Sequence, residues 1–314
     1  MQTLTPELKS LLTQLSQHLQ SEPDKNPPLL EVWDLWIQSL DLAPETKAGH
    51  YYAARRQILR ANNPLAADTG WFLGNTLAPQ TYNVRLWLLK SMAAWAVAEG
   101  LLSNSPWAKI KSRKKTKKII KPFSRSEAAR IIAGFEESYP AWVPFAKFLF
   151  LSGCRISEAI GLQWQNVDFE RGEICICESL SRRPGKNYER VRKCTKSGSV
   201  RFLKINSELA KVFEKVSIVK NSDDLVFLNP TGTNCIDCHN FRRCWKKVLA
   251  TANISYRCPH VIRHSFASHA IEQGCPLTGV AYLLGHTDTR MVAQTYGHLI
   301  NRPSLPSILG GNDD

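Results

Sequence analysis

Apolar residues recur at helical intervals in the first third of the chain, and Pro-rich or Asn-Pro turns separate the periodic segments. After an opening amphipathic helix or arm over residues 1–27, helices are predicted over residues 29–40 and 45–62 and from Thr81 onward. The last of these has an apolar stripe that we expect in a core, made of Val84, Trp87, Leu88, Met92, Trp95 and Ala96. The pattern predicts a small all-helical domain over residues 28–108.

A second set of periodic segments follows the first domain. Ser124, with Glu127 three residues later, matches a capping box at the start of a helix, and a long apolar run ends at Gly153. Over residues 172–179 and 199–205 the pattern changes to alternation, which predicts two strands that each have one face in water. These strands predict a small β-hairpin in an otherwise helical region.

Helical periodicity then returns and continues almost to the end of the sequence. It predicts helices over residues 208–220 and 235–252, the second capped by Asn234, and a helical pair over residues 258–298. Residues 122–314 are therefore predicted to form a second domain. The predicted fold class is mainly α with a small β-hairpin or sheet, in which a helical N-terminal domain precedes a C-terminal α+β domain.

The composition favours a nucleic-acid partner. The 314 residues include 41 Lys and Arg against 27 Asp and Glu, which gives a net charge of +14 and a pI near 9.4. No signal peptide is recognised and no apolar run is long enough to span a membrane, so we expect no membrane partner. Nine cysteines without a secretory signal fit a reducing environment, and we expect a cytoplasmic protein.

A dense basic segment joins the two predicted domains. Eight of the thirteen residues from 109 to 121 are basic, namely Lys109, Lys111, Arg113, Lys114, Lys115, Lys117, Lys118 and Lys121. Like charges at this density repel one another and resist compact folding, which indicates a linker or arm. The segment is either a solvated tether or, as we favour, a strap that follows a phosphate backbone and binds DNA.

A cysteine-rich motif suggests a different kind of site. Cys235, Cys238 and His239 match the C-x-x-C-H pattern of haem attachment. With Cys244 they also offer four zinc ligands, but residues at these offsets on one helix do not easily surround an ion. We therefore keep a cytoplasmic redox or metal protein as a minor alternative and expect no metal site.

Two segments near the predicted strands contain candidate cationic groups. Arg155 and Glu158 are i, i+3 neighbours on a short helix after Gly153, so the carboxylate can hold the guanidinium in a fixed pose. Such a pair is as often structural as functional. Lys196 lies at the tip of the predicted β-hairpin beside a Ser-Gly turn, where an exposed lysine by itself indicates little.

The last predicted helices have the clearest chemical pattern. A helix that starts at Pro259 places His260 and Arg263 about one turn apart on one face. A proton-transfer imidazole and an anion-binding guanidinium then share a surface, and a Gly-His pair at His286 and a tyrosine at Tyr296 follow. This predicts a site for a phosphate and a nucleophile, whereas the His-x-x-Arg spacing alone also fits solvated polar residues on a helical pair.

Together these residues resemble the tyrosine recombinase (phage integrase) family in four blocks. The segment LSGCRISEAIGLQW resembles the family's first-arginine box, and TKSGSVRFLKI resembles its β-hairpin lysine segment. The segment HVIRHSFASHAIEQGCPLTGVAYLLGH is similar to its His-x-x-Arg to Gly-His stretch, and QTYGH to its nucleophile box. The resemblance covers residues 122–298, and YNVRLWLLKSMAAWAVAEGLLSNSPW more weakly resembles the family's helical core-binding domain.

The resemblance implies cleavage and rejoining of DNA strands through a covalent 3′-phosphotyrosine. Arg155 and Arg263 would clamp the scissile phosphate, because two guanidinium forks match the geometry of its oxygens. Tyr296 would attack as the nucleophile with His260 as its proton-transfer helper, and Lys196 would protonate the leaving 5′ oxygen. The reaction conserves bond energy in the phosphotyrosine, so we expect no metal, nucleotide or other cofactor.

Further residues would support this clamp. His286 would donate a hydrogen bond to the phosphate, and Glu158 would orient Arg155. Two features depart from the family's pattern. The tyrosine follows the Gly-His pair by ten positions, one more than usual, and Lys193 lies close enough to Lys196 to compete for the role of the acid.

The resemblance also implies partners and a location. We expect double-stranded DNA core sites, a tetramer that exchanges strands through a Holliday junction, and a home in a prokaryotic nucleoid, a phage or another mobile element. Accessory or directionality factors are compatible with the sequence, and the apolar tail over residues 299–314 is expected to dock on a neighbouring protomer. Two alternatives are a type IB-like topoisomerase, which acts on one duplex, and a non-catalytic DNA-binding regulator with the same fold.

Overall fold

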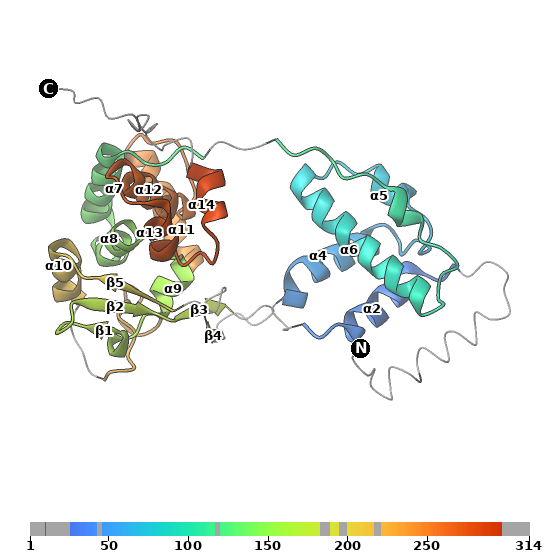
Figure 1. The fold of residues 1–314 in the computed structure, drawn as a ribbon, viewed down its shortest axis with the longest axis horizontal. Coiled ribbons are helices and arrows are strands. Elements are labelled where there is room, and N and C mark those ends of the chain that lie inside the picture. The colour runs from blue at the N-terminus through green and yellow to red at the C-terminus, as the bar shows by residue number, and fades with distance from the viewer. Residues whose placement is uncertain are drawn as a thin grey trace, which may run out of the picture. The chain divides into compact units, whose positions relative to one another are not determined.

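The structure is a computed structural model of the chain (Figure 1). It describes residue 10 and residues 26–42, 46–116, 120–182, 189–194, 200–216 and 221–296. The chain divides into two compact units, of which unit 1 contains residues 1–118 and unit 2 contains residues 119–182 and 190–314. The point of division lies within the basic segment.

Unit 1 is helical. Its elements are α2 (Leu29–Ser39), a π-helical turn (Lys47–Tyr51) that continues into α4 (Tyr52–Arg60), α5 (Gly70–Leu73), α6 (Pro79–Ala98) and a 3₁₀ turn (Pro106–Lys109). Asn62 and Asn63 adopt left-handed backbone conformations after α4, where the sequence predicted a turn. The short helix α5 was not predicted, because four residues are too few to show a period.

Aromatic side chains form much of the core of unit 1. Trp33, Phe72 and Trp107 are fully buried, and Phe72 stacks on the ring of Tyr82 with centroids 4.7 Å apart. The indole N–H of Trp107 donates a hydrogen bond to the Ala66 carbonyl at 2.8 Å, so its one polar group is satisfied. The unit therefore has an apolar core of its own.

One residue of the predicted apolar stripe lies outside this core. Trp87 is 60% exposed, so its predicted burial was wrong, whereas Met92 and Ala96 of the same stripe are buried. Because α6 is apolar on nearly all sides, its sequence does not decide which side faces inward. In the structure the face of α6 that contains Leu89 is buried in the core. Trp87 lies two residues earlier and so on the opposite face.

Part of the basic segment folds against unit 1. The Asn83 amide and the Arg113 backbone exchange two hydrogen bonds of 2.8 Å, and the Arg113 guanidinium donates to the carbonyls of Asn75 and Leu77 at 2.8 Å. The guanidinium carbon also lies 3.8 Å from the centroid of the Tyr82 ring. The predicted resistance to compact folding therefore fails at Arg113, because carbonyl acceptors and an aromatic face offset the repulsion between like charges.

Unit 2 combines helices with two small sheets (Figure 1). Its helices are α7 (Arg125–Ser138), α8 (Val143–Ser152), α9 (Ile156–Gly161), α10 (Ser207–Val216), α11 (Cys238–Thr251), α12 (His260–Glu272), α13 (Leu277–Leu284) and α14 (Thr289–Tyr296). Its strands are β1 (Val167–Asp168), β2 (Glu173–Ile176), β3 (Glu178–Arg182), β4 (Arg190–Cys194) and β5 (Arg201–Lys204). The predicted fold class, mainly α with a small β-sheet, is confirmed.

The first sheet has the strand order β1-β2-β5 and is antiparallel. It contains both predicted strands, with Ile174 opposite Leu203. Both of these side chains are buried, whereas Phe202 is half exposed, which confirms that β5 has one face in water. Arg201 shares the inward face with Leu203 and is fully buried.

The second sheet, β3 and β4, was not predicted, although the first two residues of β3 fall within the strand predicted over residues 172–179. The hairpin lies against α9 so closely that a Cβ atom on Gly161 would be 2.7 Å from the backbone nitrogen of Leu180. The Arg192 guanidinium donates to the Gly161 carbonyl at 2.9 Å and to the Glu178 carboxylate at 2.8 Å. Contacts with α9 and ion pairs, rather than an apolar alternation, therefore hold this hairpin.

Two helix starts test the predicted caps. Ser124 and Glu127 form the predicted capping box of α7, since each side chain accepts a hydrogen bond from the backbone N–H of the other. The predicted cap of α11 was wrong. Asp237 rather than Asn234 accepts hydrogen bonds from the first backbone N–H groups of that helix.

The described residues contain no helix with the length and apolarity needed to cross a membrane. Across the same ranges, no three His, Cys, Asp or Glu side chains are grouped as metal ligands would be. Cys235 precedes α11 and Cys238 is its first residue, so the prediction of one helix over residues 235–252 was wrong at its start.

Candidate active site

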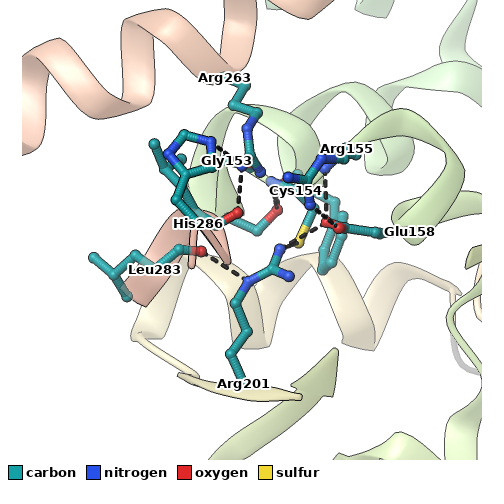
Figure 2. Close-up of polar contacts among 11 residues, drawn as sticks. Gly153, Cys154, Arg155, Glu158, Arg201, Arg263, Leu283 and His286 are labelled. Atoms are coloured by element: carbon teal, nitrogen blue, oxygen red, sulfur yellow. Dashed lines mark hydrogen bonds and ion pairs between the residues drawn. The ribbon is translucent and has the colours of Figure 1, made fainter. Parts of the chain in front are cut away.

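The site in unit 2 begins at the turn between α8 and α9 (Figure 2). Gly153 ends α8 in a left-handed conformation, and a side chain there would place its Cβ atom 2.5 Å from the ring of Phe266. Arg155 then precedes α9. Its backbone N–H donates to one oxygen of Glu158 at 2.9 Å, and its guanidinium donates to the other at 2.6 Å. The predicted Arg155–Glu158 pair is therefore present, and its guanidinium is fixed in one pose.

Glu158 also binds a second arginine. Its carboxylate lies 2.7 Å from the Arg201 guanidinium, and both side chains are fully buried. Arg201 further donates to the Leu283 carbonyl at 2.8 Å and contacts the Cys154 sulfur at 3.6 Å (Figure 2). Burial alone would raise the pKa of Glu158, but Arg201 and Arg155 outweigh burial and hold it below its usual value. Glu158 is therefore the shared anion between two cations.

Arg263 reaches the same turn from α12. Its guanidinium donates to the Gly153 carbonyl at 3.0 Å and to the Leu284 carbonyl, and lies 3.1 Å from Nε2 of His286. Burial, followed by the charge of Arg155, lowers the pKa of Arg263 to about 10. Among the described contacts, its Nε–H and one Nη1–H remain available to a ligand.

The hydrogen bond to Arg263 fixes the tautomer of His286. A guanidinium only donates, so Nε2 of His286 must accept and its proton lies on Nδ1. Nδ1 is buried and has no hydrogen-bond partner among the described residues. Burial and the neighbouring arginines lower the pKa of His286 to about 4, which keeps the ring neutral. His286 is therefore a neutral ring next to Arg263, and its Nδ1–H is unpaired among the described residues.

The charges of this cluster suit a phosphate ester. Three guanidinium groups, those of Arg155, Arg201 and Arg263, lie around the single carboxylate of Glu158, which leaves a net charge of +2. A phosphodiester carries one negative charge and gains more on its oxygens when an oxygen nucleophile attacks it. Fixed cationic donors in a buried site stabilise that charge without reorganisation.

Tyr296 is the last residue of α14 and is 5% exposed. Its hydroxyl is hydrogen-bonded to Nδ1 of His264, and the two ring centroids are 5.8 Å apart. Burial raises the pKa of Tyr296 to about 12, against the opposing charge of Arg263. Burial, with His260 and Arg263 beside it, lowers the pKa of His264 to about 4. The resting pair is therefore a neutral phenol and a neutral imidazole.

Several predicted site residues come together. Arg155, Glu158, Arg263 and His286 surround one turn, and Tyr296 contacts the helix that contains Arg263. His260 lies one turn from His264 on α12 with ring centroids 5.2 Å apart and the planes nearly perpendicular. Among the described residues, His260 makes no hydrogen bond to the tyrosine, and its side chain is exposed.

Some predicted residues remain untested. Lys196, Lys117 and Lys118 and the tail over residues 299–314 lie outside the described residues. Lys193, the rival to Lys196, lies on β4 opposite Ser179.

Two residues of the site, Arg201 and His264, were not predicted. The positions of both along their strand or helix indicate where their side chains lie. In the predicted strand over residues 199–205, Arg201 lies two positions before Leu203 and therefore on the same face as this apolar residue, where a buried guanidinium needs an anion. His264 follows His260 by four positions and therefore lies on the same helix face.

Comparisons with known proteins agree with this architecture. A sequence model described as the phage integrase family matches residues 123–302. A "Tyrosine recombinase XerC-like" protein of Caldanaerobacter subterraneus subsp. tengcongensis is 30% identical over 255 residues, which cover 72% of this chain and 64% of that protein. A "Tyrosine recombinase XerC" of Corynebacterium efficiens is 26% identical, with 73% of this chain and 69% of that protein covered. The chain thus spans about two thirds of the length of these relatives.

Solved structures share the fold. The Tn1549 transposon integrase in complex with a circular intermediate DNA superposes with a TM-score of 0.73 at 18% identity, over 86% of this chain and 95% of that one. A lambda integrase tetramer bound to a Holliday junction superposes with a TM-score of 0.69 at 14% identity, over 88% and 81% of the two chains.

Proposed function

The chain belongs to the phage integrase family of tyrosine recombinases, and from that premise we propose that it cleaves and rejoins DNA at specific sites through a covalent bond to Tyr296. One observation carries the proposal. Arg155, Arg263 and His286 converge on the turn after α8, and Tyr296 is hydrogen-bonded to the helix that supplies Arg263. We interpret the two arginines and His286 as a phosphate clamp, and Tyr296 as an oxygen nucleophile held next to it by the hydrogen bond to α12.

The proposed chemistry follows from these groups. The Tyr296 oxygen attacks the scissile phosphorus, the bond from phosphorus to the 5′ oxygen breaks, and a 3′-phosphotyrosine forms. Arg155 and Arg263 bind the non-bridging oxygens, on which charge accumulates. The Nδ1–H of His286 supplies a further hydrogen bond, and the leaving oxygen takes a proton from the acid expected at Lys196. Resealing is the reverse reaction with a 5′ hydroxyl as the nucleophile.

The proposed partners are double-stranded DNA core sites and further copies of the chain. The net charge of +14 and the basic residues 109–121 supply the attraction to a phosphate backbone. The structural neighbour with a Holliday junction is a tetramer, and the shared fold supports the same assembly for this chain. Accessory factors remain an expectation of the family.

Covalent capture tests the proposal. A nicked duplex that contains the repeated or inverted sites found beside the gene should trap the wild-type protein as a band that survives denaturation. Tyr296→Phe should lose this band by at least about 10³-fold and still bind the duplex in a gel shift, because only the nucleophilic oxygen is removed. An adduct formed by Tyr296→Phe would show that another residue attacks. Exchange between two labelled duplexes then separates a recombinase from a topoisomerase.

A further inference from the structure

His264 is the described residue that touches the oxygen of the proposed nucleophile. Tyr296 is buried, and its hydroxyl proton needs an acceptor, since an unpaired buried hydroxyl is costly. Among the described residues the only acceptor in hydrogen-bond contact with it is Nδ1 of His264. A neutral imidazole has one acceptor nitrogen. The hydroxyl therefore donates to Nδ1, and the imidazole proton lies on Nε2.

We propose that His264 is a catalytic residue whose Nδ1 takes the proton of Tyr296 during DNA cleavage and returns it during resealing. The inference rests on the proposed function. As the bond from the Tyr296 oxygen to phosphorus forms, the O–H bond breaks and its proton passes to Nδ1, which becomes part of an imidazolium. The departing 5′ oxygen receives its own proton from the separate acid expected at Lys196. In resealing, Nδ1 returns its proton to the tyrosine oxygen as the O–P bond breaks.

The geometry favours His264 over His260, the residue that the sequence suggested as the proton acceptor. His260 is exposed, and its described contact is with the ring of His264 at 5.2 Å, edge to face. His264 is partly buried and is directly hydrogen-bonded to the tyrosine. A general base must lie within hydrogen-bond reach of the proton that it removes. His264 satisfies this condition in the described structure.

The surroundings of His264 explain why the tyrosine stays protonated without DNA. His260 and Arg263 on α12, His286 after α13 and Tyr296 on α14 all face the imidazole. With a pKa of about 4 for His264 and about 12 for Tyr296, the proton remains on the oxygen. A phosphate in the clamp offsets the charge of Arg263, and the tyrosine proton becomes acidic only while its oxygen bonds to phosphorus. Proton transfer is therefore coupled to attack on a bound phosphate.

The experiment compares two trapping duplexes in single-turnover covalent capture. One has the normal 5′ oxygen at the scissile position, and the other has a 5′ bridging sulfur, which leaves without needing a proton. His264→Asn keeps a hydrogen-bonding group near the position of Nδ1 but cannot accept a proton. We expect it to slow capture by about 10²- to 10⁴-fold on both duplexes. The matched control is His239→Asn on α11, an exposed histidine outside the site, which should keep the wild-type rate.

The alternatives give different results. A defect of His264→Asn that disappears with the sulfur duplex would assign His264 to the leaving group and overturn the inference. So would a rate within about threefold of the wild type, because the amide would then suffice as a positioning group. A faster rate would also overturn the inference, because the hydrogen bond to His264 would then hold the nucleophile back. Absence of any adduct from the wild-type protein would instead contradict the proposed function.

A pH profile of the wild type supplies a second measurement that does not depend on the variant's folding. On the sulfur duplex the capture rate should fall as pH falls through the pKa of His264. A plot of the logarithm of the rate against pH should have the slope expected for one proton. With a pKa of about 4 for His264, the rate should stay nearly level above about pH 5 and fall to about half by pH 4, and a rate at pH 4 equal to or higher than that at pH 6 would overturn the inference. Where His264→Asn folds, as judged by circular dichroism and duplex binding, its profile should lack this limb.

Discussion

The two units of the molecule differ in what they bury. No polar or charged side chain among the described residues of unit 1 is fully buried, whereas unit 2 buries Ser152, Glu158, Arg201, Arg263, Ser265 and Ser268. Buried ionic groups seldom improve stability over an apolar core. Unit 2 therefore keeps charges inside for another reason, and they converge on the turn that the proposed chemistry requires. The described part of unit 1 is therefore held by an apolar core, whereas unit 2 accepts buried charges where the proposed site lies.

The largest test of this contrast is Glu158→Gln. The amide would place N–H donors against the buried donors of Arg201 and leave three cations without an anion. Breaking one partner of a buried ion pair costs about 3–5 kcal/mol. We expect unit 2 to lose this free energy of unfolding while unit 1 is unchanged. Urea titration followed by fluorine NMR of protein labelled with fluorotryptophan measures the unfolding of each unit separately. Six of the nine tryptophans lie in unit 1 and three in unit 2.

The control for this variant is Glu178→Gln in the same unit. Glu178 and Arg192 form an ion pair at 2.8 Å, but both side chains are about one third exposed. Exposed pairs contribute about 0–1 kcal/mol, so this variant should shift the unfolding midpoint little. Equal losses in the two variants would mean that burial around Glu158 has no special energetic role.

The second test is the effect of pH, in which unit 2 should lose stability first. His264 and His286 have pKa values of about 4 in the folded protein, below the usual ~6.5 of an unfolded chain. Between these values the unfolded state binds more protons, so stability is lost as pH falls from about 7 toward 4. The expected loss from pH 7 to pH 5 is on the order of 1–2 kcal/mol for each imidazole.

The same urea titration at pH 7 and pH 5 measures this loss. In unit 1 the one histidine among the described residues is the exposed His50. The tryptophan resonances of unit 1 should therefore show a much smaller shift of the urea unfolding midpoint. A similar shift in both units would contradict the assignment of the effect to His264 and His286.

Local sequence patterns predicted much of the fold. The capping box at Ser124, the stop at Gly153 and the strands that contain Ile174 and Leu203 follow from short-range rules of capping, glycine conformation and alternation. The hairpin of β3 and β4 does not follow from such rules. Contacts with α9 and ion pairs hold it in place, and its strands have no apolar alternation. Tertiary contacts override weak local preferences in such a segment.

The site shows the same division. Arg155, Glu158, Arg263, His286 and Tyr296 were identified from spacing and resemblance. The partner of the tyrosine was not, because spacing along α12 places two imidazoles on one face and only the packing of α14 decides which one meets Tyr296. Likewise, only tertiary structure shows that Arg201 shares the carboxylate of Glu158.

The smallest effect is expected at Arg113, the residue of the basic segment that folds against unit 1. Arg113→Ala removes two hydrogen bonds to carbonyls and the contact with the Tyr82 ring, which should cost unit 1 about 1–2 kcal/mol. Lys114→Ala, a matched change at an exposed neighbour, should leave the free energy of unfolding within about 0.5 kcal/mol of the wild type.

In DNA binding, Lys114→Ala should have the larger effect of the two variants. Lys114→Ala should lower the salt dependence of duplex affinity by about one phosphate contact, and Arg113→Ala should not, because its guanidinium is already occupied. An equal change in salt dependence for both variants would show that Arg113 leaves its carbonyl partners to bind DNA.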